Sequence, residues 1–137
     1  MAKGKRRTVS RSEAWGHLAK AEEFLKGAQA SSDAGRRDAA LLDAIHSAIS
    51  AADAVTVALA GVRSVDPDHQ RAADLLDEVA GGPGVKPPSR QLHELLSGKN
   101  IVEYESRRAR AKEATDAVKR AERLVSWARS IVAEAKV

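Results

Sequence analysis

The sequence contains no cysteine, so disulfide bonds and thiolate metal sites are excluded. Aromatic residues make up only 3% of the chain although hydrophobic residues reach 43%, so the apolar content is mainly alanine, leucine, valine and isoleucine. Small aliphatic side chains of this kind favour closely packed helices over sheets of aromatic strands. At 137 residues, the chain has the length of one domain with one core.

Long apolar runs and metal motifs are missing as well. No uninterrupted run approaches the roughly 18 residues that a membrane span requires, and no apolar core follows the basic amino terminus as it does in a secretion signal. We therefore expect a cytoplasmic protein without a membrane partner. No two of the histidines His17, His46, His69 and His93 are three or four residues apart. We accordingly expect no metal site and no cofactor.

The net charge of +4 comes from the amino terminus. Its basic residues are Lys3, Lys5, Arg6, Arg7 and Arg11. Without these five, 18 basic residues face 19 acidic ones, a net charge of −1. We predict residues 1–11 as a flexible basic tail and residues 12–137 as a single folded domain. Such a tail either contacts phosphates or serves only as a solubilising terminus.

Apolar spacing predicts an all-α fold. Helices are expected at 12–30, 37–62, 67–79 and 89–96, with a last helix that begins between residues 102 and 106 and ends near residue 135. The helix at 37–62 is apolar around most of its circumference, which is typical of the central helix of a bundle. Glycines and prolines predict a plain loop over 81–88. The expected architecture is an up-and-down bundle of four to five helices.

The predicted core is rich in alanine, and each buried alanine removes little apolar surface from water. At about 25 cal/mol per Å² of apolar surface, burial of such side chains stabilises the fold only modestly. We therefore expect further burial in a homodimer, through faces that carry Trp15 or Trp127.

A narrow line of polar residues crosses the apolar surface of the helix at 37–62. Its members, spaced so that they share one helix face, are Asp43, His46, Ser47, Ser50 and Asp53. The line is either a solvated strip on an otherwise buried helix or one wall of a polar cleft. In a cleft, His46 and Asp53 would perturb each other's pKa.

Polar groups also gather where the last helix is expected to begin. The basic residues there are Lys99, Arg107, Arg108, Arg110 and Lys112. Together with Tyr104, the one tyrosine of the chain, such a cluster can hold phosphate and stack a base. The alternative is an ordinary helix start, with acidic residues near the positive end of the helix dipole. The arginines would then be solvated or paired with Glu113 and Asp116.

The chain resembles the HEPN domain family, small helical-bundle proteins found in toxin–antitoxin systems and other nucleic-acid-related settings. The resemblance covers about residues 14–135 and rests on KAEEFL at 20–25, DAIHSAISAADA at 43–54 and KNIVEYESR at 99–107. It implies a metal-independent ribonuclease site shared across a dimer interface. In that family the site carries an arginine, often followed by asparagine, and then a histidine after a short spacer.

On this motif, Lys99 falls at the arginine, Asn100 at the asparagine and Tyr104 at the histidine, while Asp53 falls at the polar position of the second helix. Lysine lacks the bidentate fork with which arginine grips phosphate. Tyrosine, with an unperturbed pKa near ~10, is a poor base at neutral pH.

The main interpretation is a non-catalytic or weakly catalytic HEPN dimer that binds RNA, a nucleotide or a protein partner such as a cognate antitoxin. Its expected ligand-binding residues are Lys99, Asn100, Tyr104, Arg107, Arg108 and Asp53. Two alternatives remain open. One is a metal-independent endoribonuclease that uses Lys99, Asn100 and Tyr104 with His46 as candidate base. The other is a structural adaptor whose exposed apolar face meets another protein.

Overall fold

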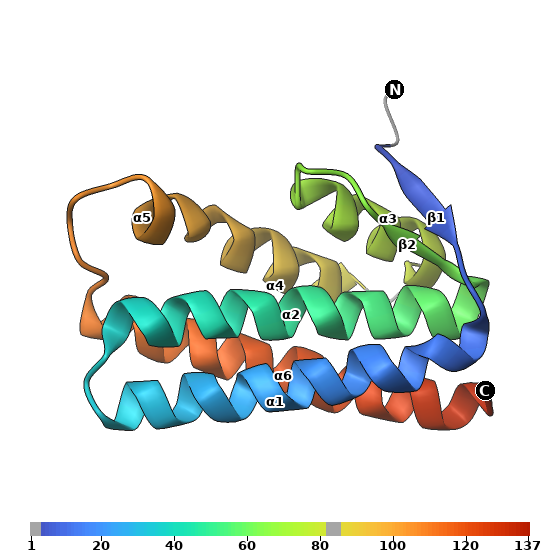
Figure 1. The fold of residues 1–137 in the computed structure, drawn as a ribbon, viewed down its shortest axis with the longest axis horizontal. Coiled ribbons are helices and arrows are strands. Elements are labelled where there is room, and N and C mark those ends of the chain that lie inside the picture. Colours follow the sequence, from blue (N-terminus) through green and yellow to red (C-terminus); the bar gives the residue numbers. More distant parts are fainter. Residues whose placement is uncertain (1–3, 82–85) are drawn as a thin grey trace.

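Three long helices form the main layer of the fold in the computed structural model, which describes residues 4–81 and 86–137. They are α1 (Ala14–Asp33), α2 (Arg37–Ala60) and α6 (Ala111–Ala135). Helices α2 and α6 run in the same direction and α1 runs in the opposite one (Figure 1). The other side of α2 is covered by α3 (Gln70–Ala80), α4 (Lys86–Ser97) and the short α5 (Lys99–Glu103). The predicted all-α helical bundle is confirmed.

Helix α2 is the central helix, as its apolar circumference predicted. It contacts α1, α3, α4, α5 and α6, and most of its residues from Ala40 to Ala58 are buried. By length and composition alone it could cross a membrane, but 72% of its most apolar window is buried inside the bundle. Its hydrophobicity is therefore explained by its position in the core.

Alanine sets the close packing of α1 and α2. Residues without exposed surface include Ala21 on α1 and Ala44 and Ala48 on α2. Small side chains let two helix backbones approach each other closely. Here they come close enough for the buried Ser47 Oγ to donate a hydrogen bond to the Ala21 carbonyl oxygen at 2.7 Å.

The amino-terminal segment differs from its prediction. Strand β1 (Arg6–Thr8) pairs antiparallel with β2 (Val62–Ser64), directly after α2. The Arg11 guanidinium donates to a main-chain carbonyl of α2 at 2.7 Å, and Arg6 binds Glu78 of α3 at 2.8 Å. The prediction of a flexible tail over 1–11 is therefore corrected for residues 4–11. Main-chain and guanidinium hydrogen bonds hold them on the bundle, although three-residue strands leave no periodic signal in the sequence.

Gly61 allows the chain to turn from α2 into β2. It ends the helix in the left-handed conformation, with φ of 62°, which glycine adopts without steric cost. Its carbonyl oxygen accepts a hydrogen bond from the Val9 N–H at 2.8 Å. A Cβ atom at this position would lie 3.0 Å from the Val9 carbonyl oxygen, so the close approach of the amino-terminal segment also depends on glycine.

The other helix ends lie within three residues of their predicted positions, with one exception at α6. Helix α4 starts at Lys86 rather than 89, because prolines are tolerated in a first helical turn, where the N–H groups lack helical partners anyway. Residues 82–85 of the predicted loop lie outside the described residues.

The last helix begins at Ala111, later than the predicted start at 102–106. The residues before it form the separate helix α5 and a connecting loop, residues 104–110. This loop is anchored to the first turn of α2, because Asp38 accepts hydrogen bonds from the Ala109 N–H at 2.7 Å and from Arg108 Nε at 3.1 Å. Ala109 is buried by this contact. A tertiary anchor thus holds residues 104–110 out of the helix.

Candidate functional site

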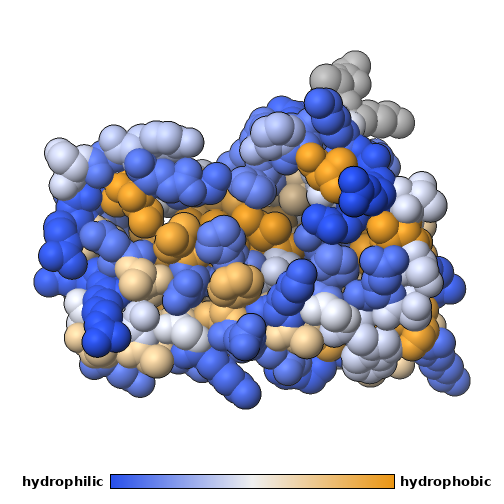
Figure 2. All heavy atoms as spheres, viewed as in Figure 1, coloured by the Kyte–Doolittle hydropathy of each residue, from blue (hydrophilic) through white to orange (hydrophobic). Residues whose placement is uncertain are grey.

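A pocket of about 410 Å³ lies between α5 and the start of α3. Its lining includes Lys99, Asn100 and Tyr104 from the predicted site, together with His69 from the segment before α3. The surface in Figure 2 is hollowed between the α5 end of the molecule and the α3 end. The fold therefore brings together three of the sequence-predicted residues and adds a histidine. We call this the α3–α5 pocket.

Lys99 brings a positive charge to the α3–α5 pocket, which the Asp68 carboxylate also lines. The side chain of Lys99 is 23% exposed, and its Nζ atom lies 3.5 Å from the Glu103 carboxylate one turn later on α5. A single ion pair at this distance in partly solvated surroundings is weak. The ammonium group therefore remains available to a phosphate that enters the pocket.

Tyr104 ends α5 and stands at the rim of the pocket. Its side chain is 78% exposed, although its N–H donates to the Asn100 carbonyl oxygen at 3.0 Å. An exposed phenol ring held by a fixed backbone costs little conformational entropy on binding. It offers a flat face on which a nucleobase can stack.

His69 is a pocket residue that sequence reasoning missed. Burial lowers the pKa of His69 from its ordinary value, and the nearby charges of Lys99 and His46 lower it further. The neutral imidazole is therefore favoured at neutral pH, with a ring nitrogen able to accept a proton. No spacing rule links His69 to Lys99, because the two residues lie 30 positions apart in the sequence. The one available signal was the position of His69 at the predicted start of a helix.

His46 does not line the pocket, although its charge acts on His69. Its ring packs against Phe24 of α1, with 5.3 Å between ring centroids and an interplanar angle of 30°. The sequence-predicted candidate base His46 therefore lies outside the pocket lining and packs against α1.

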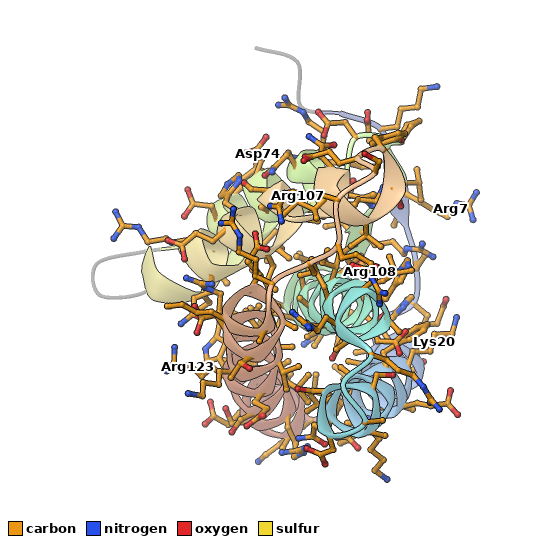
Figure 3. All side chains as sticks on the ribbon, turned by 90° about the vertical axis from the view of Figure 1, so that its left-hand side faces the viewer. Arg7, Lys20, Asp74, Arg107, Arg108 and Arg123 are labelled. Atoms are coloured by element: carbon orange, nitrogen blue, oxygen red, sulfur yellow. The ribbon has the colours of Figure 1, made fainter. Side chains whose placement is uncertain are left out.

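Two arginines of the predicted basic cluster bind acidic partners away from the pocket. Both Nη atoms of Arg107 donate to the Glu113 carboxylate, at 2.9 and 3.0 Å. Arg108 pairs with Asp38 as described above, and Lys112 pairs with Asp116 at 2.7 Å. Figure 3 shows Arg107 and Arg108 at the end of the bundle where α5 connects to α6. In this arrangement the ion pairs of Arg107 and Arg108 hold the loop before α6 in place.

The electrostatics of the Arg107–Glu113 pair agree with its geometry. The hydrogen bonds from Arg107 lower the pKa of Glu113 to about 2, assisted by a bond from the Arg110 N–H. The same contacts raise the pKa of Arg107. Both groups are therefore charged at neutral pH, and the pair fixes the start of α6.

Asp53 lies apart from the pocket, at the β2 side of the bundle. Its side chain is 12% exposed, and one oxygen lies 4.0 Å from Arg63 Nε. Burial raises the pKa of Asp53 to about 7, against the opposing effect of the Arg63 and Lys20 charges. The predicted coupling with His46 is therefore replaced by coupling with these two cations.

The polar line on α2 is thus not one continuous cleft wall. Ser47 and Asp53 are buried by packing, whereas Asp43, His46 and Ser50 are partly exposed. No set of three histidine, aspartate or glutamate side chains in the described part of the chain is arranged to bind a metal ion.

The sequence model of the HEPN domain matches residues 14–131. The chain belongs to the HEPN domain family. The HEPN match begins at the first residue of α1, reaches into the last turns of α6 and includes the whole α3–α5 pocket. No curated protein and no solved structure matches the chain.

Proposed function

We propose that this HEPN protein binds single-stranded RNA in the α3–α5 pocket, without efficient cleavage. The observation that carries this proposal is the convergence of Lys99, Asn100, Tyr104 and His69 on one pocket of about 410 Å³. A lysine ammonium attracts phosphate, and the phenol and imidazole rings offer flat faces to bases. Binding needs only this charge and stacking, whereas cleavage also requires an acid and a base at the scissile phosphate.

We propose further that the protein acts in the cytoplasm as a homodimer. Trp15 is a large apolar side chain that remains 48% exposed, and burial in a dimer would remove this surface from water. A cognate antitoxin is the protein partner that a toxin–antitoxin role would supply. Sedimentation equilibrium tests the dimer, and a monomer at micromolar concentration contradicts it.

The Lys99→Ala variant should bind RNA more weakly and with less dependence on salt. Losing one phosphate contact to a single strand lowers the slope of log affinity against log salt concentration by about 0.7. The measurement is fluorescence anisotropy of a labelled single-stranded RNA across a salt series. Lys112→Ala is the matched control, because Lys112 also pairs with an acidic residue four positions later but lies outside the pocket.

Tyr104→Ala should weaken the same binding roughly 5- to 150-fold, since stacking on an aromatic side chain contributes about 1–3 kcal/mol per base. The salt slope should remain unchanged, because no phosphate contact is lost. Equal affinities for the parent protein, Lys99→Ala and Tyr104→Ala would overturn the proposed pocket. Arg107→Ala should have a smaller effect than Lys99→Ala, because Arg107 is already bound to Glu113.

A second candidate function, metal-independent RNA cleavage, is favoured by the lowered pKa of His69. A neutral imidazole can take the proton of a ribose 2′-hydroxyl as its oxygen attacks the adjacent phosphorus. The bond from phosphorus to the 5′-oxygen then breaks, and that oxygen takes a proton from the Tyr104 phenol or from water. The products are a 2′,3′-cyclic phosphate and a free 5′-hydroxyl, with no change in oxidation state.

Cleavage by this route should persist in EDTA and disappear in His69→Ala, and the His46→Ala variant should retain part of the activity. Gel analysis of labelled RNA after long incubation provides the measurement. The absence of any cleavage by the parent protein removes the enzymatic candidate and leaves the binding proposal intact.

A further inference from the structure

Strand β1 has main-chain groups that face away from β2. The Lys5 carbonyl oxygen accepts a hydrogen bond at 2.9 Å and the Val9 N–H donates one at 2.8 Å, both with residues that flank β2. Alternate residues of an antiparallel strand bond to opposite sides, so the N–H and C=O groups of Arg6 and Thr8 point away from β2. These groups have no hydrogen-bond partner in the described part of the chain. We call them the β1 edge.

No helix or strand of the described residues lies beside the β1 edge. The sheet has two strands, β1 and β2, and Figure 1 shows β1 at the margin of the molecule with β2 on one side only. Arg7 and Thr8 are exposed. An open strand edge is a template to which another extended chain can add through main-chain hydrogen bonds.

Tertiary contacts hold β1 in its extended conformation before any partner binds. The Lys5 N–H donates to the Asp66 carboxylate at 2.9 Å. The Arg6 guanidinium binds Glu78 of α3 at 2.8 Å, which ties the strand to the helices. A partner that adds to this edge therefore orders little of the protein, and the conformational entropy lost on binding is mainly that of the partner.

One face of the β1–β2 ribbon is basic. Lys5 and Arg7 share this face as alternate residues of one strand, and Arg63 lies directly opposite Arg7 in the register. Like charges in directly opposite positions on paired strands are destabilising. Figure 3 shows Arg7 projecting outward on the same flank as Lys20 of α1. We call Lys5, Arg7 and Arg63 the basic face.

The carboxylates beside the basic face leave Arg7 without an acidic partner. Asp53 lies 4.0 Å from Arg63, and Asp66 accepts the Lys5 N–H. Arg7 forms no ion pair within 4.0 Å among the described residues. Negative charge placed between Lys5 and Arg7 would relieve their repulsion and that between Arg7 and Arg63.

We propose that the β1 edge and the basic face bind an acidic, extended segment of a partner protein as a third, antiparallel strand. Its main-chain groups pair with Arg6 and Thr8, and its acidic side chains, at alternate positions, lie beside Lys5 and Arg7. Basic charges on an edge strand oppose pairing with uncharged or basic strands. A peptide is favoured over a nucleic acid because the edge presents donors and acceptors at strand spacing, and phosphate oxygens satisfy only the donors.

A fluorescein-labelled peptide of alternating glutamate and valine residues tests this surface on the whole chain. Fluorescence anisotropy should show saturable binding that weakens with salt. In antiparallel pairing with glutamates on the basic face, the valine N–H groups bond to the β1 edge. N-methylation of the valines should therefore weaken binding at least tenfold. N-methylation of the glutamates is the matched control and should have little effect, and replacing glutamate with lysine should abolish binding.

Variants of β1 test the same contacts from the protein side. Thr8→Pro removes a donor of the β1 edge but none of the bonds to β2, and should weaken peptide binding roughly 2- to 12-fold. Thr8→Val keeps the N–H and is its control. Arg7→Glu should weaken binding at least tenfold. Arg37→Glu makes the same charge change at an exposed position at the start of α2 and should bind normally. Circular dichroism confirms that each variant is folded.

Three results would overturn the surface: no saturable binding of the acidic peptide, equal affinities for this peptide and its valine-methylated form, or equal affinities of Arg7→Glu and the parent. A loss of single-stranded RNA binding in Arg7→Glu, with peptide binding unchanged in Thr8→Pro, would make the basic face a nucleic-acid surface instead. Lys99→Ala should leave peptide affinity unchanged. The outcome is therefore independent of whether the α3–α5 pocket binds RNA.

Discussion

Asp53→Asn is expected to flatten the pH dependence of folding stability between about pH 4 and pH 7. The folded protein holds Asp53 with a pKa of about 7, against an ordinary value of 3.8. Between these values the folded state binds a proton that the unfolded state has released. The contribution of Asp53 to the free energy of unfolding is therefore greatest below pH 4. It falls as the pH rises to 7 and stays constant above pH 7.

The size of this effect follows from the pKa difference. A shift of one pH unit corresponds to 1.36 kcal/mol, so the Asp53 contribution changes by up to about 4 kcal/mol across this range. Glu113 acts in the opposite sense, because its pKa is lowered to about 2 and its stabilising contribution is lost as the pH falls. The pH profile of the parent protein combines both effects, and the comparison with Asp53→Asn isolates the first.

Urea unfolding of both proteins from pH 4 to pH 8 measures this difference. The stability of the variant minus that of the parent should rise with pH, since asparagine has no carboxylate to deprotonate. Asp33→Asn, which replaces an exposed aspartate at the end of α1, is the matched control for removing a carboxylate from the surface. If the two profiles run parallel through this range, the buried carboxylate is not the origin of the pH dependence.

The second large effect is expected from Ile45→Ala, which should lower the free energy of unfolding by about 2–5 kcal/mol. Ile45 has no exposed surface and is among the largest fully buried side chains. Much of the surrounding core is alanine, and alanine side chains have no alternative rotamers with which to fill a cavity. The space left by the isoleucine should therefore remain largely empty.

Denaturant unfolding at pH 7 provides the measurement, with Leu59→Ala as the control on the same helix. Leu59 is 42% exposed, so its truncation should cost much less than that of Ile45. A similar small loss in both variants would indicate that the alanine core is plastic enough to collapse around the missing side chain.

The sequence by itself determined the all-α class, the central position of α2 and membership of the HEPN family, now matched over residues 14–131. These features were predictable because helical periodicity and local motifs depend on residues that are close together in the sequence. Lys99, Asn100 and Tyr104 could be grouped for the same reason, since they lie within one short segment and come together on α5 and its end.

The tertiary structure alone decided which other groups meet these residues. His69 reaches the pocket because α3 packs beside α4, and Arg107 is withdrawn from it because Asp38 anchors the loop before α6 and Glu113 binds the guanidinium. The pKa of Asp53 depends on burial and on Arg63 from the following strand, and the amino-terminal strand depends on pairing with that strand. Each is a contact between groups that are separated in sequence. Such contacts form only when the whole chain has packed, because burial and distance, rather than local pattern, determine their energies.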